Sequence, residues 1–238
     1  MTGGEPVGQT RRGPTEDWPF PIACGYQRVV NPETAATGLQ NAFFTYEAVL
    51  RLSCIVLLTD FVRLGYTSAG VFRAVQALKH PHIGDWFGAL AALGAETRRK
   101  AGSRDDRPFS EGLIESAASY PRLRIEDGNL HEVIVTARNR DFGHSGSWSE
   151  STAAVKLQVV RRYLECVLEH FAPLRLTRFF GCGNESEVFL LSGIQAAPLQ
   201  RTELTEQVAQ ALMNSPVVAA SQEGEVLGLA PLMCRGGS

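Results

Sequence analysis

The sequence predicts a mainly α-helical bundle followed by a small β-rich (α+β) C-terminal subdomain. Through residues 18–172, apolar side chains recur every three or four positions, the period of a helix with one buried face. After Pro173 the apolar runs are short and are separated by Gly, Asn, Pro and Ser, which is typical of strands and turns. With 238 residues, 44% of them hydrophobic, the chain can bury a substantial core. We expect a flexible arm over residues 1–17, the bundle over 18–172 and the subdomain over 173–238.

The beginning of the bundle is predicted from prolines and from one long apolar stripe. Pro19 and Pro21 exclude a helix over residues 18–23, so we expect an extended segment that packs along the helices. Residues 31–33, Asn-Pro-Glu, combine a cap residue, a first-turn proline and an acidic charge, which predicts a helix start. Gly65 is expected to end this helix. Its apolar stripe consists of Leu39, Phe43, Tyr46, Leu50, Cys54, Leu57, Phe61 and Leu64.

Four further helices are predicted before the subdomain. One covers Val71–Leu78, and another starts near Asp85. The polar residues 100–109 are then expected to form a surface linker. Residues 127–129, Asp-Gly-Asn, open a helix with an apolar face, and residues 149–171 form a long helix that begins at a Ser cap.

The subdomain is predicted as short strands with one helix. Glu203–Met213 has helical spacing, and Gln222–Glu225 is typical of a hairpin turn. The expected strands cover Leu174–Phe180, Val188–Leu191, Val217–Ala220 and Val226–Leu229.

Composition narrows the classes of function. A net charge of −2 excludes a general polyanion binder, so any contact with nucleic acid must come from a local patch. The N-terminal residues lack the apolar core of a signal peptide, and the most apolar run, Leu52–Leu58, is too short to span a bilayer. Five scattered cysteines are typical of reduced cytosolic thiols. We therefore expect a cytoplasmic protein without a membrane partner.

The candidate site lies at the end of one predicted amphipathic helix, where Arg138, Asn139 and His144 occur. Steps of four residues from Leu130 pass through Ile134 to Arg138, so the guanidinium should project from the core-facing side. Because a buried unpaired arginine is costly, this group must reach a cleft, a carboxylate or a phosphate. A Gly-containing turn can fold His144 back toward Arg138, while Asn139 faces another side and can brace the turn.

These residue types suit cleavage of RNA by its own 2′-hydroxyl. His144 would act as the general acid or base, since an unperturbed imidazole has a pKa of about 6.5. Arg138 would stabilise charge on the phosphorane through its fork of N–H donors. This chemistry requires no metal. His80 and His82 have no Cys, Asp or Glu clustered at ligand spacing, so we expect neither a metal nor a cofactor.

The Arg138-Asn139 pair followed by His144 resembles the Arg-Asn-(x)n-His signature of HEPN domains. The resemblance implies a small helical bundle that acts either as a metal-independent ribonuclease or as an inactive dimerisation module. In that family the Arg and His of two protomers typically face each other across a dimer cleft, so the resemblance implies a homodimer. The order of segments, with residues 18–23, Gly84–Trp86 and then the motif, is also similar to N-terminal helical modules of bacterial conflict and defence proteins.

Three functional hypotheses remain open from the sequence. The first is a homodimeric, metal-independent endoribonuclease of a bacterial defence or toxin system, with RNA as its substrate. The second is a non-catalytic sensing or dimerisation module that binds a partner effector or regulatory protein. The third is a helical scaffold unrelated to HEPN domains, in which Arg138, Asn139 and His144 only tie down a loop through hydrogen bonds.

Overall fold

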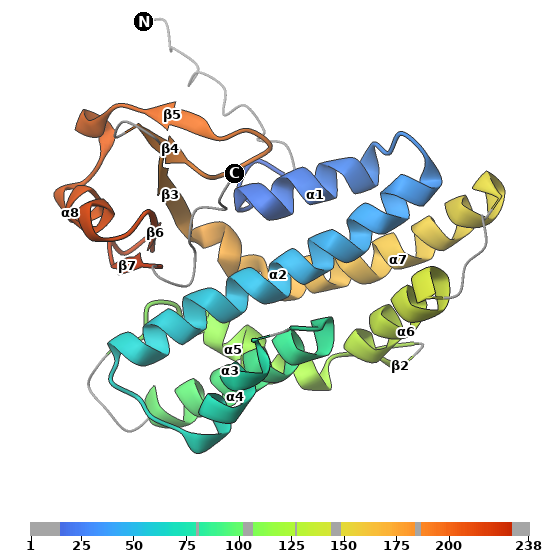
Figure 1. Cartoon of the computed structure of the whole chain (residues 1–238), viewed down its shortest axis with the longest axis horizontal. Helices are drawn as coiled ribbons and strands as arrows, with labels where there is room; N and C mark the ends of the chain where they lie inside the picture. Colours follow the sequence, from blue (N-terminus) through green and yellow to red (C-terminus); the bar gives the residue numbers. More distant parts are fainter. Residues whose placement is uncertain are drawn as a thin grey trace, which may run out of the picture.

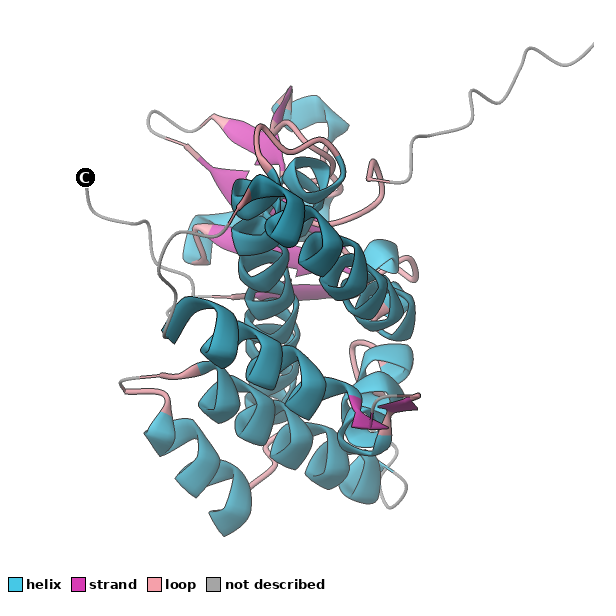
Figure 2. Ribbon diagram, turned by 90° about the vertical axis from the view of Figure 1, so that its right-hand side faces the viewer, coloured by secondary structure: helices cyan, strands magenta, loops and turns pink. Residues whose placement is uncertain are grey.

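A computed structural model describes residues 15–79, 81–101, 107–126, 128–143, 149–183 and 187–229. These residues form a helical bundle and, beside one end of it, a five-stranded antiparallel sheet (Figure 1). Figure 2 shows the strands of this sheet gathered in one region, while a separate pair of short strands lies among the helices. The predicted fold class, mainly helical with a small β-rich C-terminal part, is confirmed.

The first helix overturns a prediction made from proline. Residues 18–23 are not an extended segment, because α1 spans Phe20–Val30 and Pro19 is its cap residue. Pro21 lies in the first turn, where the backbone N–H has no partner within the helix and the fixed φ of proline suits a helix. Proline therefore marks the start of this helix instead of excluding it.

The predicted long stripe forms the central helix α2, Ala35–Arg63. Its start differs from the prediction, because Asn31 ends α1 and Thr34 is the cap of α2. The Thr34 side chain accepts from the backbone N–H of Thr37, whose side chain in turn accepts from the N–H of Thr34, which satisfies two end groups of the helix. Gly65 follows the helix with a φ of 63°, as the prediction of a glycine stop requires.

α2 is the one helix in the described part of the chain that is long and apolar enough to cross a membrane. In its most apolar window, however, 61% of residues are buried inside the protein. It packs against α1, α4 and α7, and its stripe from Leu39 to Phe61 lies in the core. The helix thus has the environment of a core helix, and the fold is compatible with a soluble protein.

Helices α3 (Ala69–Ala77) and α4 (Ile83–Ala101) lie close to their predicted positions. Helix α4 runs to Ala101 and so includes the first two residues of the expected polar linker, 100–109. Residues 102–106 lie outside the described ranges. Helix α5 (Glu111–Ser119) was not predicted and is followed by the 3-10 turn η1 (Tyr120–Arg122).

The candidate motif belongs to the next part of the chain. Two very short strands, β1 (Arg124–Ile125) and β2 (Gly128–Asn129), pair before α6 (Leu130–Gly143). Helix α7 (Glu150–His170) then begins at the predicted cap, where the Ser149 side chain accepts from the N–H of Thr152.

The subdomain contains the predicted strands and one more. After the 3-10 turn η2 (Ala172–Leu176), which replaces the predicted start of the first strand, the sheet has the order β5-β4-β3-β6-β7. The unpredicted strand contains Pro198 and lies at an edge, where a missing N–H costs no ladder bond. The elements are β3 (Arg178–Cys182), β4 (Val188–Leu190), β5 (Ala197–Leu199), η4 (Arg201–Glu203), α8 (Glu206–Asn214), β6 (Val217–Ala220) and β7 (Val226–Gly228).

One hydrophobic core joins the bundle and the sheet. Phe179, Ala219 and Leu227 come from neighbouring strands and lie in the same cluster of buried residues as the stripe of α2. The opposite face of the sheet packs separately against Val208 of α8. The two faces of the sheet are therefore covered by different elements, the bundle on one side and α8 on the other.

Candidate functional site

Helix α6 carries Arg138 and Asn139 in its second half. Leu130 and Ile134 are fully buried and attach the first half of the helix to the core. Arg138 lies one further step along the same stripe and is half-buried, while Asn139 is exposed. The structure thus places the arginine where the core-facing side of α6 meets the surface.

His144 lies outside the described residues, as do the positions up to 148. Helix α6 ends at Gly143, directly before His144, and α7 begins after the cap Ser149. Arg138 and Asn139 are therefore placed by the structure, whereas the predicted approach of His144 to Arg138 stays a prediction.

A groove of about 460 Å³ lies between α6 and α7, and neither Arg138 nor Asn139 is among the residues that line it. Arg140, two residues after Arg138, lines it from α6, and Lys156 lines it from α7. The apolar side chains of Val155 and Val159 also line it and are 65% and 44% exposed. With the half-buried ring of Tyr163, the groove combines two cations and the carboxylate of Glu132 with surfaces that suit bases or other flat apolar groups.

The groove was not predicted, although its pattern is present in the sequence. On α6, Val133, Thr136, Ala137 and Arg140 follow each other at steps of three and one, which places them on one side of the helix. Only the position of α7 reveals that this side faces Lys156, which the sequence alone suggests to be part of a solvated surface.

Arg161, another basic residue of α7, has a structural role instead. Its Nε donates to Glu165 Oε1 at 2.8 Å, and the hydroxyl of Tyr26 donates to the same oxygen at 2.8 Å. This contact joins α7 to α1. Arg161 is therefore engaged away from the groove, in a part-buried contact between two helices.

A buried polar chain anchors the first half of α6 to the core. The hydroxyl of Tyr120 donates to that of Tyr46 at 3.0 Å, and the Tyr46 hydroxyl lies 2.5 Å from Nδ1 of His131. Because the Tyr46 oxygen accepts the hydrogen bond from Tyr120, the hydroxyl proton of Tyr46 points to Nδ1 of His131. The imidazole of His131 must be neutral to accept this second hydrogen bond. Burial lowers the pKa of His131 to about 4, and its ring stacks on Phe87 at 3.7 Å.

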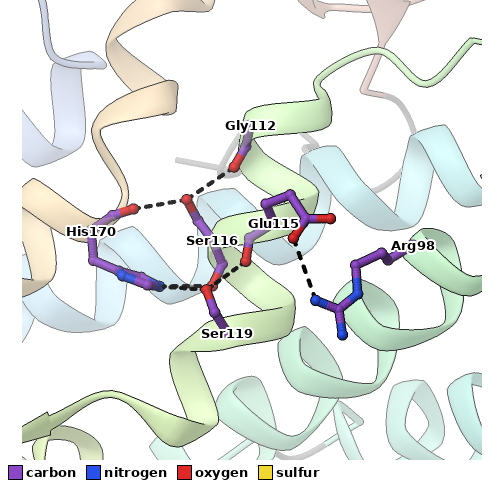
Figure 3. A network of polar contacts seen from close by, with 6 residues as sticks. All are labelled: Arg98, Gly112, Glu115, Ser116, Ser119 and His170. Carbon is purple, nitrogen blue, oxygen red and sulfur yellow. Dashed lines mark hydrogen bonds and ion pairs between the residues drawn. The ribbon is translucent and has the colours of Figure 1, made fainter.

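A second histidine lies beside a serine but does not form a nucleophile–base pair with it. His170 Nε2 is 3.4 Å from Ser119 Oγ and 2.8 Å from the carbonyl oxygen of Ser116 (Figure 3). Because a carbonyl only accepts, Nε2 must carry a proton and cannot take one from the serine. Ser119 Oγ donates instead to the Glu115 carbonyl at 2.6 Å. This network ties α5 to the end of α7.

The described part of the chain contains no group of three or more His, Cys, Asp or Glu side chains that could hold a metal ion. No family model matches the chain, and comparisons with curated proteins and with solved structures find no similar protein. The features of this structure that bear on function are therefore the end of α6 and the groove between α6 and α7.

Proposed function

We propose that the protein is a HEPN-like, metal-independent endoribonuclease of the kind used in bacterial toxin and defence systems. The observation that carries the proposal is the position of Arg138, half-buried at the end of the core-facing stripe of α6. A groove lined by Arg140 and Lys156 runs along another side of the same helix. An arginine at such a position can hold a phosphate while its aliphatic part stays packed.

Each residue of the motif has a separate role in this proposal. Arg138 binds the scissile phosphate and stabilises the charge of the phosphorane. His144 transfers the proton of the 2′-hydroxyl or that of the leaving oxygen. Asn139, which is exposed next to Arg138, stabilises the end of α6. Arg140 and Lys156 bind neighbouring phosphates of the RNA in the groove.

A homodimer is part of the proposal. In a composite site, the motif of one protomer would complete that of its partner, and the exposed Val155 and Val159 on α7 offer an apolar surface that a second copy would cover. The protein would then be inactive as a monomer.

The test is cleavage of a labelled total tRNA pool by purified protein in the presence of EDTA. Replacement Arg138→Ala should reduce cleavage by about a hundredfold or more, because a fixed donor to the developing charge is lost. The matched control is Arg122→Ala, an exposed arginine in η1 outside the groove, which should retain wild-type activity. Equal activity of the two variants would remove Arg138 from the site.

A second candidate function, a non-catalytic interaction module, is favoured by a different surface. A groove of about 770 Å³ lies between the end of α2 and α3 and is lined almost entirely by apolar side chains. Val62 and Phe72 at this groove are 67% and 63% exposed, and soluble proteins rarely leave such neighbouring apolar side chains in water without a partner. In this alternative the groove joins two copies of the chain.

Light scattering over a range of protein concentrations tests the alternative. Phe72→Ser should shift a dimer toward the monomer, because the largest apolar contact is lost. Met213→Ser is the matched control, since Met213 on α8 is 85% exposed and lies outside this groove. A wild type that is monomeric at every concentration, or a dimer equally stable in both variants, would contradict assembly through this groove.

A further inference from the structure

The sheet of the subdomain presents one face away from the bundle. In the antiparallel register, Arg178 pairs with Ala220, and Phe180 pairs with Leu190 on one side and Val218 on the other. Side chains of directly paired residues lie on the same face of a sheet. This outer face is therefore continuous from β4 across β3 to β6, and Arg178 and Phe180 share it.

Helix α8 covers only part of the outer face. It has nine residues, and Val208 is its buried contact with Phe180 and Ala220. The uncovered part is a hollow of about 680 Å³, here called the subdomain hollow, which is bounded by the sheet, by the start of α8 and by the segment before β3. Its apolar floor includes Phe180, Leu190 and Leu199.

The rim of the subdomain hollow carries two arginines, Arg175 and Arg178, and two carboxylates, Asp17 and Glu203. Arg178 is exposed and lines the hollow, and the described residues place no carboxylate within ion-pair distance of it. Arg175, the second arginine of the rim, lies 3.4 Å from Asp17. The carboxylate of Glu203 also lines the hollow, but it already accepts from the backbone N–H of Gln200 at 2.6 Å. Among the described residues, Arg178 is therefore the rim arginine that has no carboxylate partner.

We propose that the subdomain hollow binds a small organic carboxylate with an apolar body. The guanidinium of Arg178 would take the carboxylate in a two-point contact, and the body would lie on Phe180, Leu190 and Leu199. The volume falls within the range of pockets that bind small molecules, and the hollow joins an apolar floor to a polar rim that includes Thr177, Thr205 and Ser221. This site is separate from the groove between α6 and α7 and does not depend on ribonuclease activity.

Calorimetric titration of the full chain with octanoate and with octan-1-ol tests the proposal, because the two probes share a chain and differ in charge. Octanoate should bind with a defined stoichiometry, and Arg178→Gln should weaken its binding about tenfold while binding of octan-1-ol stays unchanged. Arg124→Gln is the matched control, an exposed arginine on β1 outside the hollow, and it should bind octanoate like the wild type.

A second variant examines the floor. Leu199→Trp on the edge strand β5 should fill part of the hollow and weaken the binding of both probes. Circular dichroism checks that Leu199→Trp is folded. If this variant does not fold, the octanoate affinities of Arg178→Gln and Arg124→Gln test the proposal. The absence of saturable octanoate binding, or equal octanoate affinity of those two arginine variants, would overturn the proposal.

Discussion

Replacing Gly94 with alanine should lower the free energy of unfolding by about 2 kcal/mol or more, because this glycine allows two helices to touch. A Cβ atom at Gly94 would lie 2.5 Å from the backbone nitrogen of Ala118 and 2.7 Å from the carbonyl carbon of Ala117. Both are backbone atoms of the α5 segment, so the added methyl group can be accommodated only if α4 and α5 move apart. A thermal melt should show a decrease in Tm of about 4 °C or more.

The same helix provides a control of the opposite sign. Gly88 is exposed in α4, and a Cβ at this position would meet no atom within 4 Å. Gly88→Ala should therefore stabilise the protein by up to about 1 kcal/mol, the difference in helix propensity between the two residues. A Gly94→Ala variant that melts at or above the wild-type temperature would show that α4 and α5 are not in close contact.

Acidification from pH 7 to pH 5 should destabilise the protein through His131. Burial lowers the pKa of this histidine to about 4 in the folded state, whereas it is 6.5 in an ordinary environment. Below pH 6.5 the unfolded chain therefore binds a proton that the folded chain does not, and the free energy of unfolding decreases as pH falls. The expected loss between pH 7 and pH 5 is about 2 kcal/mol.

Urea titrations at the two pH values measure this effect, and His131→Asn isolates it. The variant lacks the titrating group and should lose about 2 kcal/mol less than the wild type over the same interval. The buried carboxyl of Asp60 acts in the opposite direction, because burial raises its pKa, and this contribution is common to both proteins. Identical pH dependence of the two proteins would place His131 in water and contradict the buried chain with Tyr46.

The parts of the fold that the sequence predicts are those with a strong local signal. Helix α2 shows its stripe over eight positions, and α7 has both a stripe and a Ser cap. The start of α1 is missed because Pro21 has two opposite meanings, a helix breaker in the interior and a good residue in the first turn. Helix α5, Glu111–Ser119, has only nine residues, several of them small, and the close contact at Gly94 helps to hold it in place.

In the candidate site, too, the sequence predicts only the features that have a local signal. Steps of four residues along α6 lead from the buried Leu130 and Ile134 to Arg138, so the half-buried position of Arg138 can be predicted from the sequence alone. The groove with Lys156 depends on how α7 packs beside α6, and the contact of Tyr46 with His131 joins residues that are 85 positions apart. Neither contact has a local signal. The subdomain hollow likewise exists because α8 is too short to cover the sheet, which only the paired strands reveal.

The two proposed functions differ in what they require from the end of α6. A ribonuclease needs Arg138 and His144 near one phosphate, within one protomer or between two, and it needs cations such as Arg140 to hold the RNA. An interaction module needs only the apolar surface, such as that of Phe72, and tolerates the loss of either motif residue. The chemical identity of the RNA ends therefore distinguishes the ribonuclease from the interaction module better than a measurement of binding does.

The most direct measurement is the identity of the RNA ends formed in EDTA by the wild type and by His144→Ala. Attack of the 2′-hydroxyl predicts fragments that end in a 2′,3′-cyclic phosphate from the wild type and none from the variant, while both proteins show the same circular dichroism spectrum. Cyclic phosphate ends formed equally by both proteins, or folded dimeric wild type that forms none, would contradict a ribonuclease site at the end of α6.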